Sequence, residues 1–442
     1  MTPPQRTIVI IGAGYVGLVT AAGLAVPGNL IRLVEKGQQR LNALRTGRIP
    51  LHEDGLQAAF EAALDENRLE ILGAPPIETP DLVLICVGTP IDDDGVSDLT
   101  QLRSALVEVA PMVASGATLV IRSTLPVGTT QALVADAAVP SARTFTNPEF
   151  LRQGTALADF RSPSRAVVGR FPDADPDRLS AVVEALVPHG VPTLIVGVVE
   201  AEIIKNGANA FLALKLSFTN ELAGLCERYG ADVDVVLGGI GSDPRIGLTY
   251  LRPSFGFGGS CLPKELRTIA AAGEQVGLPM HVTSAASEAN ASHQRRFVER
   301  VAAAASGLEG RRVAVLGLAF KAGTDDIRSS PAMNVVRLLA EAGADVVAHD
   351  PEASANAALA LPGLSLASTP LEALRGADVA VITTEWPAYQ NLDWAAARRA
   401  MARPVVVDGR RLLDPAQMAN LGFDLWSLGS PDPIPVVVNR AS

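Results

Sequence analysis

Residues 7–35 read TIVIIGAGYVGLVTAAGLAVPGNLIRLVE, in a chain of 442 residues. The β-branched run at 8–11 is typical of a buried parallel strand, and a glycine-rich turn, GAGYVG at 12–17, follows it directly. An apolar helical stretch comes next, and a second apolar run ends at Glu35. The order strand, glycine turn, helix, strand predicts the βαβ unit with which a doubly wound α/β domain begins.

Each glycine of this turn has its own expected role. Gly12 allows the tight turn, Gly14 admits a pyrophosphate, and Gly17 lets the helix approach the sheet closely. Glu35 ends the second strand, where a carboxylate can accept hydrogen bonds from ribose hydroxyls and would repel a 2′-phosphate. The pattern predicts NAD as cofactor in preference to NADP. Glycines that serve packing alone are the alternative.

The start of the chain has no charged side chain from Thr7 to Ile31, which imitates a signal peptide or a membrane span. Its central glycines, and Pro27 near its end, argue against a spanning helix. The net charge of −10 disfavours binding to nucleic acid or anionic membranes. The three cysteines cannot form a disulfide framework, and the five histidines have no metal-ligand spacing. We therefore expect a cytoplasmic, reduced protein that binds no membrane, no nucleic acid and no metal.

The rest of the chain predicts three domains. Apolar runs at 81–90, 117–126 and 165–170 continue the first α/β domain. The segment 200–229 has a helical period with no proline and no strand pattern, and RRVAVLGLAF at 311–320 begins a second α/β pattern. The fold class is therefore α/β, with two Rossmann-like, doubly wound parallel sheets joined by a helical region that contains one long helix. The expected domains are an NAD-binding domain (1–199), a central helical domain (200–305) and a C-terminal Rossmann-like domain (306–442).

One cysteine has the setting of a nucleophile. Cys261 lies in the loop FGFGGSCLPKE (255–265), which leads into a helix, so helix amides and Lys264 would favour its thiolate. A buried packing cysteine is the alternative reading. Cys86, in an apolar strand, and Cys226, on an apolar helix face, are expected in the core.

Two further groups of polar residues are candidates for chemistry. Glu202, Lys205 and Asn209 are spaced to share one face of the long helix, where lysine and asparagine could hold a reacting oxygen. Taken alone, the spacing favours a solvated helix face over a chemical role. Glu149, in the loop after a predicted strand, could act as a general base, although most loop carboxylates are simply exposed.

Seven motifs together resemble one known family. They are GAGYVG (12–17), CVGTP (86–90), STLPVGT (123–129), NPEFL (147–151), AEIIKNGAN (201–209), FGFGGSCLPK (255–264) and GLAFKAGTDDIRSSP (317–331). In this order they resemble the UDP-glucose and GDP-mannose dehydrogenases, which oxidise a nucleotide-sugar alcohol to a carboxylate in two NAD-dependent steps.

The resemblance implies a role for each matching residue. Cys261 matches the nucleophile, which forms a thiohemiacetal and then a thioester, and Glu149 matches the acid/base of thioester hydrolysis. Lys205 and Asn209 match the pair that polarises the reacting oxygen. Thr124 and Glu265 complete the expected catalytic set. The expected cofactor contacts are Gly12, Gly14, Tyr15, Val16, Gly17, Glu35, Arg40, Thr89, Thr124, Gln153 and Arg328. The expected substrate contacts are Glu149, Phe150, Leu151, Lys205, Asn209, Arg245, Tyr250, Leu251, Phe257, Gly258, Lys321 and Arg410.

The chain departs from the family pattern at three positions. Glu265 replaces an aspartate, Gln153 replaces a glutamate, and Glu35 replaces the commoner aspartate. The first change could alter the reach of a catalytic carboxylate, and the second removes a charge near the expected nicotinamide. The third should still favour NAD.

The resemblance leaves the sugar open. DPRIG (243–247) and TEW (384–386) resemble UDP-glucose enzymes, whereas YLRPSFGFGGSCLPK (250–264) resembles GDP-mannose enzymes. We favour UDP-glucose, because Arg245 would face the sugar, with a UDP-N-acetylhexosamine as a third candidate. A homodimer or higher homo-oligomer is expected through the long helix. The competing functions are a one-step dehydrogenase with a structural Cys261 and a non-catalytic protein that binds NAD or a nucleotide sugar.

Overall fold

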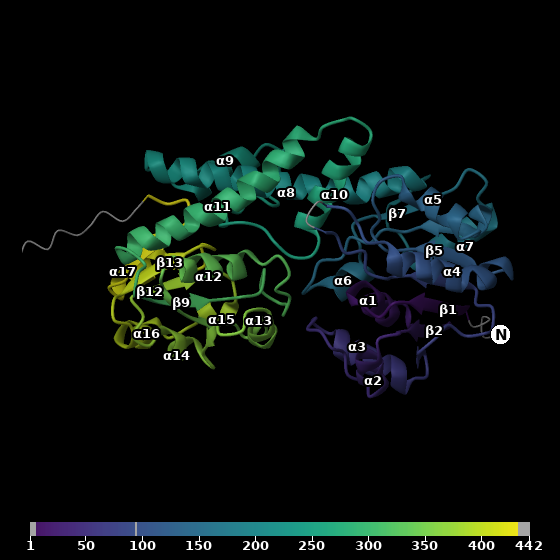
Figure 1. Ribbon diagram of the computed structural model, residues 1–442, viewed down its shortest axis with the longest axis horizontal. Coiled ribbons are helices and arrows are strands. Elements are labelled where there is room, and N and C mark those ends of the chain that lie inside the picture. Colours follow the sequence, from purple (N-terminus) through teal and green to yellow (C-terminus); the bar gives the residue numbers. More distant parts are fainter. Residues whose placement is uncertain (1–5, 93–94, 432–442) are drawn as a thin grey trace, which may run out of the picture. The chain divides into compact units, whose positions relative to one another are not determined.

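The computed structural model of the chain describes residues 6–92 and 95–431. It forms two compact units, which Figure 1 shows and which we describe separately. Unit 1 holds the described residues up to 208 together with 267–280, and unit 2 holds 209–266 together with the described residues from 281 onward. Each unit contains one sheet, so the predicted α/β class with two sheets is confirmed.

Unit 1 is built on a sheet that contains, among the described residues, eight strands in the order β3-β2-β1-β4-β5-β6-β7-β8. The first six follow the Rossmann order. The strands are β1 (Arg6–Ile11), β2 (Asn29–Val34), β3 (Leu69–Leu72), β4 (Leu82–Ile85), β5 (Thr118–Ile121), β6 (Thr144–Thr146), β7 (Ala166–Arg170) and β8 (Thr193–Gly197). Every neighbouring pair is parallel except β6 and β7, which run antiparallel. The prediction of a parallel sheet is therefore wrong at that one pair.

Helices cover both faces of this sheet. They are α1 (Tyr15–Leu24), α2 (Gln38–Arg45), α3 (Leu56–Asp65), α4 (Thr100–Ala114), α5 (Thr129–Asp136), the short 3-10 helix η1 (Ser141–Arg143), α6 (Ala156–Arg161) and α7 (Pro176–Leu186). Strand β1 alternates between the two cores: Ile8 and Ile10 pack on the side of α1 and α3, and Val9 and Ile11 on the side of α4. Burial on both faces explains the uncharged, β-branched sequence at the start of the chain.

Unit 2 repeats the same strand order. Within the part of the chain that the structure describes, its sheet has six strands in the order β11-β10-β9-β12-β13-β14, all parallel. The strands are β9 (Arg312–Leu316), β10 (Asp345–His349), β11 (Ser365–Leu366), β12 (Val379–Ile382), β13 (Val405–Asp408) and β14 (Asp424–Ser427). The helices around it are α12 (Pro331–Glu341), α13 (Ser354–Ala360), α14 (Pro370–Leu374), α15 (Pro387–Gln390), α16 (Trp394–Ala400) and α17 (Pro415–Asn420).

Four more helices complete the two units. They are α8 (Val198–Tyr229), α9 (Val233–Gly241), α10 (Leu262–Gln275) and α11 (His281–Ala305). The predicted long helix is α8, which begins in unit 1 and ends in unit 2. Inside unit 2, the end of α8 packs on α9 (Figure 1). Ser217 of α8 donates a hydrogen bond to the Ala286 carbonyl of α11 at 3.0 Å. Helix α11 in turn packs Phe297 and Val301 into the core of the second sheet.

Candidate active site

The glycine turn between β1 and α1 is closely packed at two glycines and open at the third. Gly12 has a φ of +99°, and a Cβ on Gly17 would lie 1.9 Å from the Gly12 oxygen. A Cβ on Gly14 would meet no atom within 4 Å. The turn therefore leaves space beside Gly14, as a pyrophosphate on the N-terminus of α1 requires, and Tyr15 and Val16 form the first turn of that helix.

Glu35 lies beside this turn, where β2 ends. Its Oε2 accepts a hydrogen bond from the Ala13 N–H at 3.3 Å, and its Oε1 accepts one from the Gly37 N–H at 2.6 Å. Arg40 lies 3.7 Å from the same carboxylate. The acid and the open turn are therefore adjacent, as binding of an adenosine ribose and its pyrophosphate requires.

Thr89 and Thr124 meet at the carboxyl edge of the same sheet. The Thr89 hydroxyl donates to the Thr124 carbonyl at 2.7 Å, and the Ser123 hydroxyl donates to the Val87 carbonyl at 2.7 Å. These bonds tie the loop after β4 to the loop after β5. Both loops lie at the sheet edge where doubly wound folds bind ligands.

Glu149 and Lys205 form a buried ion pair in unit 1. The Lys205 Nζ lies 3.4 Å from Glu149 Oε1, with side-chain exposures of 4% and 8%. The other carboxylate oxygen of Glu149 accepts the Leu151 N–H at 2.6 Å, and Phe150 stacks under the cations of Lys205 and Arg165. Glu149 is thus held in place rather than solvated.

The polar face of α8 is buried at its unit 1 end. Glu202 accepts from the Gly128 and Thr130 N–H groups at 2.6 and 2.8 Å, and burial raises its pKa. Lys205 is also buried. The prediction that Glu202 and Lys205 lie on a solvated helix face is therefore wrong, because both side chains are buried and make polar contacts inside unit 1.

Cys261 stands at the N-terminal end of α10, in unit 2. Its carbonyl accepts the Glu265 N–H at 2.8 Å, which begins the helix, and its thiol is exposed, with the Ser260 hydroxyl at 3.6 Å. By contrast, Cys86 and Cys226 are buried, as the sequence predicts. An exposed thiol at a helix N-terminus is set for nucleophilic attack.

Asn209 lies one turn after Lys205 on α8, and its amide donates to the carboxylate of Glu265. Glu265 is buried, with 2% of its surface exposed. The longer acid at position 265 therefore reaches the asparagine of α8 within unit 2. Its contact fixes the orientation of the Asn209 amide.

Arg328, an expected cofactor contact, lies in the loop between β9 and α12 of unit 2. It pairs with Asp326 at 2.6 Å, and this hydrogen bond, together with the charges of Asp326 and Cys261, raises the pKa of the Arg328 guanidinium. A permanent cation near a cysteine favours the thiolate. The charges of Arg328 and Cys261 therefore act on one another within unit 2.

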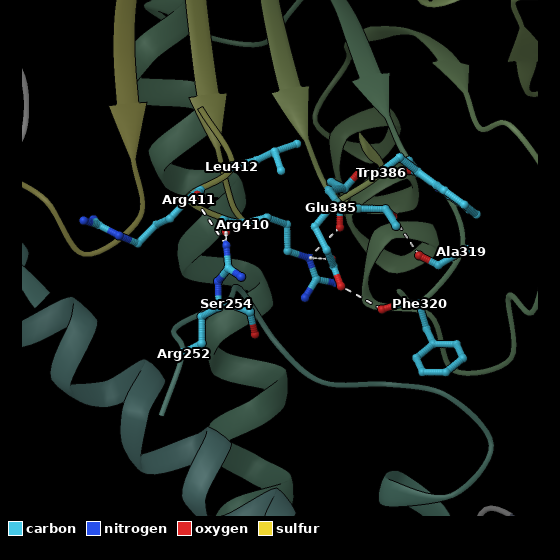
Figure 2. Close-up of polar contacts among 12 residues, drawn as sticks. Arg252, Ser254, Ala319, Phe320, Glu385, Trp386, Arg410, Arg411 and Leu412 are labelled. Carbon is cyan, nitrogen blue, oxygen red and sulfur yellow. Dashed lines mark hydrogen bonds and ion pairs between the residues drawn. The ribbon is translucent and has the colours of Figure 1, made fainter. Parts of the chain in front are cut away.

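Arg410 lies at the carboxyl end of β13, beside the loop after β9 (Figure 2). It donates to the carbonyls of Thr383 and Phe320 at 2.8 and 3.1 Å and lies 3.3 Å from Glu385. Its guanidinium also stacks on the Phe255 ring at 5.0 Å. Arg410 therefore joins the loop of Cys261 to the edge of the second sheet.

The other expected substrate residues lie in unit 2. Phe257 and Leu251 are buried, Tyr250 has a φ of +62°, and a Cβ on Gly258 would lie 2.2 Å from the Ser329 oxygen. Lys321 lies over the Phe320 ring at 5.7 Å. Arg245 pairs with Asp243 at 2.6 Å and its side chain is 88% exposed.

Comparison with known proteins gives the same family along the chain. Residues 6–187 match the NAD binding domain of the UDP-glucose/GDP-mannose dehydrogenase family, residues 199–292 its central domain and residues 314–415 its UDP binding domain. A UDP-glucose 6-dehydrogenase of Pseudomonas aeruginosa is 38% identical over 439 residues, covering 96% of this chain and 97% of its own. The chain belongs to the UDP-glucose/GDP-mannose dehydrogenase family.

Other members of the family agree with this assignment. A UDP-glucose 6-dehydrogenase of Rhizobium meliloti is 37% identical, with 96% of this chain and 100% of its own covered. The structure of a UDP-glucose dehydrogenase from Pyrobaculum islandicum has 34% identity and a TM-score of 0.86, covering 97% of this chain and 98% of that one. The resemblance drawn from the motifs is confirmed, and so is NAD as the cofactor of this dehydrogenase.

Two buried acids, one in each unit, were not singled out from the sequence. Glu53 accepts from Tyr15, Gly154 and Ala156 in unit 1. Asp350 directly follows β10 and accepts from several N–H groups in unit 2. The sequence contains a signal for Asp350, because this residue follows the second strand of its sheet just as Glu35 follows the second strand of the first sheet. Glu53 had none, since its partners lie far away in the sequence.

The structure supplies no metal centre in its described parts. In residues 6–92 and 95–431, no three His, Cys, Asp or Glu side chains gather closely enough to hold a metal ion. Within the same residues, no helix is both long and apolar enough to cross a membrane.

Proposed function

We propose that this enzyme oxidises the C6 hydroxymethyl group of UDP-glucose to the carboxylate of UDP-glucuronate, with two NAD reduced per sugar. The observation that carries the choice of substrate is the full-length similarity to relatives named UDP-glucose 6-dehydrogenase. The buried Glu149–Lys205 pair and the exposed thiol of Cys261 support the chemistry.

The residues of unit 1 fit NAD. The open space at Gly14 suits a pyrophosphate, and Glu35 suits the adenosine ribose. Thr89, Thr124 and Gln153 are further candidates for holding the cofactor, and when bound, NAD supplies the hydride acceptor for both oxidations.

The first oxidation turns the C6 alcohol into an aldehyde. Lys205 and Asn209 donate hydrogen bonds to the reacting oxygen while the hydroxyl proton and a hydride leave. The Cys261 thiolate then attacks the aldehyde carbon, and the oxygen takes up a proton, giving a thiohemiacetal. Covalent capture keeps the aldehyde on the protein.

The second oxidation turns the thiohemiacetal into a thioester, again with loss of a hydride and a proton. Glu149 takes a proton from water as the water attacks the thioester carbonyl. The carbon–sulfur bond breaks, the thiolate of Cys261 is restored and the carboxylate is released. Each cycle consumes one water and releases three protons.

The cations of unit 2 suit the diphosphate and the new carboxylate. Arg245, Lys321 and Arg410 are the candidates, because the protein as a whole carries a charge of −10 and must bind an anion through local cations. Residues 306–442 would bind the nucleotide, 1–199 the NAD, and 200–305 would carry Cys261. A cytoplasmic location suits a nucleophile that has to remain reduced.

We also propose a homodimer through α8. Phe211, Phe218 and Leu225 recur every seven residues, and Tyr229 follows four residues later, so they share one face of this helix. Each is at least half exposed, which leaves an apolar stripe for a second copy to cover. Light scattering on Phe218→Glu should show a monomer where the unaltered chain shows a dimer.

The test of the main proposal is the yield of NADH per sugar. With limiting UDP-glucose and excess NAD, we expect two NADH for each sugar. GDP-mannose and the UDP-N-acetylhexosamines serve as competing substrates. One NADH per sugar would indicate a one-step dehydrogenase, and no NADH from any nucleotide sugar would refute the proposal.

A Cys261→Ser variant tests the nucleophile separately. It should bind NAD normally and lose turnover by about a thousandfold or more, because it cannot form the thioester. Cys226→Ala, which removes a buried thiol, should retain turnover. Full turnover in Cys261→Ser would show that the thiol is structural.

A further inference from the structure

Glu53 is a buried carboxylate for which the proposed reaction has no role so far. It lies in the loop before α3, and only 6% of its surface is exposed. One oxygen accepts the Tyr15 hydroxyl at 2.5 Å and the Gly154 N–H at 2.6 Å, and the other accepts the Ala156 N–H at 2.7 Å. Its partners therefore belong to two separate segments of unit 1.

The first segment is the loop that follows Glu149. The backbone N–H groups along this loop point at three carboxylates in turn: Leu151 at Glu149, Arg152 at Asp159, and Gly154 and Ala156 at Glu53. Gly154 has a φ of +82°, so the loop turns there in a conformation that few other residues adopt. Glu53 thus provides the only one of these three anchors that lies outside residues 149–159.

The second segment is the cofactor turn. Tyr15 directly follows Gly14 and begins α1. Burial, the hydrogen bond to Glu53 and the charges of Glu53, Glu149 and Asp159 all raise the pKa of the Tyr15 phenol, which therefore stays protonated and donates. The Tyr15 ring thus contacts Glu53 directly, and the charge of Glu149 also acts on its phenol.

We infer that Glu53 is a positioning residue. It ties the cofactor turn to the loop of Glu149, and through this tie it holds Glu149 in place for the attack of water on the thioester. The inference rests on the proposed function and adds a residue that no motif or comparison assigns.

Glu53→Gln is the sharpest variant. It preserves the volume of the side chain but replaces one acceptor oxygen with an NH₂ donor, so one of the donors facing it loses its partner. We expect kcat to fall by about 10- to 100-fold, while the Kd for NAD, measured by titration without sugar, changes less than about threefold. Asp54→Asn, at the exposed neighbouring carboxylate, should leave both values unchanged.

The NADH burst separates positioning from simple loss of stability. If Glu149 is misplaced, thioester hydrolysis becomes slow, so Glu53→Gln should release two NADH per active site quickly and then turn over slowly. The acyl-enzyme should accumulate and add its mass to the protein. A merely structural role would instead lower the burst amplitude and leave the rate per active site unchanged, which would overturn the inference.

Hydrogen exchange provides a readout that does not depend on turnover. The amides of residues 151–156 should exchange at least about tenfold faster in Glu53→Gln than in Asp54→Asn. If Glu53→Gln does not fold, Tyr15→Phe takes its place, since it removes only the hydroxyl. It should then show the same slow hydrolysis, and wild-type turnover would overturn the inference.

The outcomes also separate this inference from the proposed function. If the unaltered enzyme makes no NADH from UDP-glucose, the proposed function fails, and the exchange rates alone then decide whether Glu53 anchors the loop. If the enzyme is active and Glu53→Gln turns over normally, the proposed function stands and the positioning role of Glu53 is refuted.

Discussion

Among single residues, Glu35 has the clearest consequence for specificity. Its carboxylate lies at the end of β2, beside the Ala13 N–H, where a 2′-phosphate would bring a second negative charge. Glu35→Ala should therefore raise kcat/KM for NADP relative to NAD by about tenfold or more. The measurement is the ratio of the two kcat/KM values.

A matched control is available on the neighbouring strand. Glu70 on β3 pairs with Arg32 at 2.9 Å and lies outside the glycine turn, so Glu70→Ala should leave the ratio at its original value. An unchanged ratio in Glu35→Ala would mean that the ribose is recognised by other groups.

The sequence predicts residues well where the signal is local. Gly14 and Glu35 belong to one βαβ unit, and Cys261 lies directly before the helix that it begins. Glu53 shows the opposite case, because its partner Gly154 is 101 residues away and no local pattern links them. Arg328 was expected as a cofactor contact, but its ion pair with Asp326 was not predicted.

At the scale of elements, the loop of Cys261 depends on a close approach at Gly258. A Cβ there would lie 2.2 Å from the Ser329 oxygen and 2.5 Å from a Pro331 side-chain carbon. Gly258→Ala must therefore displace the loop from the start of α12. We expect kcat/KM for the sugar to fall by about tenfold or more while the protein stays folded.

The control for this prediction is a glycine with open space around it. A Cβ on Gly238 in α9 meets nothing within 4 Å, so Gly238→Ala should keep full activity and stabilise the helix by up to about 1 kcal/mol. Equal activity of the two variants would show that the close approach at Gly258 is not needed.

The elements themselves were predictable in proportion to their length and burial. The 32-residue helix α8 and the buried strands β1 and β9 follow from apolar period and β-branched runs. Strand β6 has only three residues, too few to set a direction, so its antiparallel pairing with β7 could not be foreseen.

At the scale of the whole molecule, a buried histidine makes stability depend on pH. Burial of His293 in α11, and next the charge of Arg296, lowers the pKa of its imidazole from 6.5 to about 4. The unfolded chain takes up this proton near pH 6.5, and the native state only near pH 4. Neutral His293 therefore makes its full contribution to the free energy of unfolding above pH 6.5. As the pH falls towards 4, that contribution is lost by about 1.4 kcal/mol per pH unit, because only the unfolded chain takes up the proton.

Thermal unfolding at pH 7 and pH 5 checks this prediction. Between the two pH values, the unfolding midpoint of His293→Gln should fall less than that of the unaltered protein, by roughly 1 °C for each kcal/mol in a chain of 442 residues. His281→Gln, which replaces an exposed histidine, should fall as the unaltered protein does. Equal falls in all three proteins would show that His293 is not protonated on unfolding.

Because the two sheets share one strand order, Glu35 in the first sheet and Asp350 in the second occupy equivalent positions after the second strand. Their carboxylates differ in what they can bind. Glu35 retains 11% exposure and one long contact to the glycine turn, whereas Asp350 is 2% exposed and accepts from Leu318, Ala319 and the Trp386 indole. A carboxylate with its lone pairs already occupied offers nothing to a ribose. The second sheet therefore does not bind a dinucleotide in the way that the first sheet does. Excess NAD should not compete with the nucleotide sugar at the second sheet.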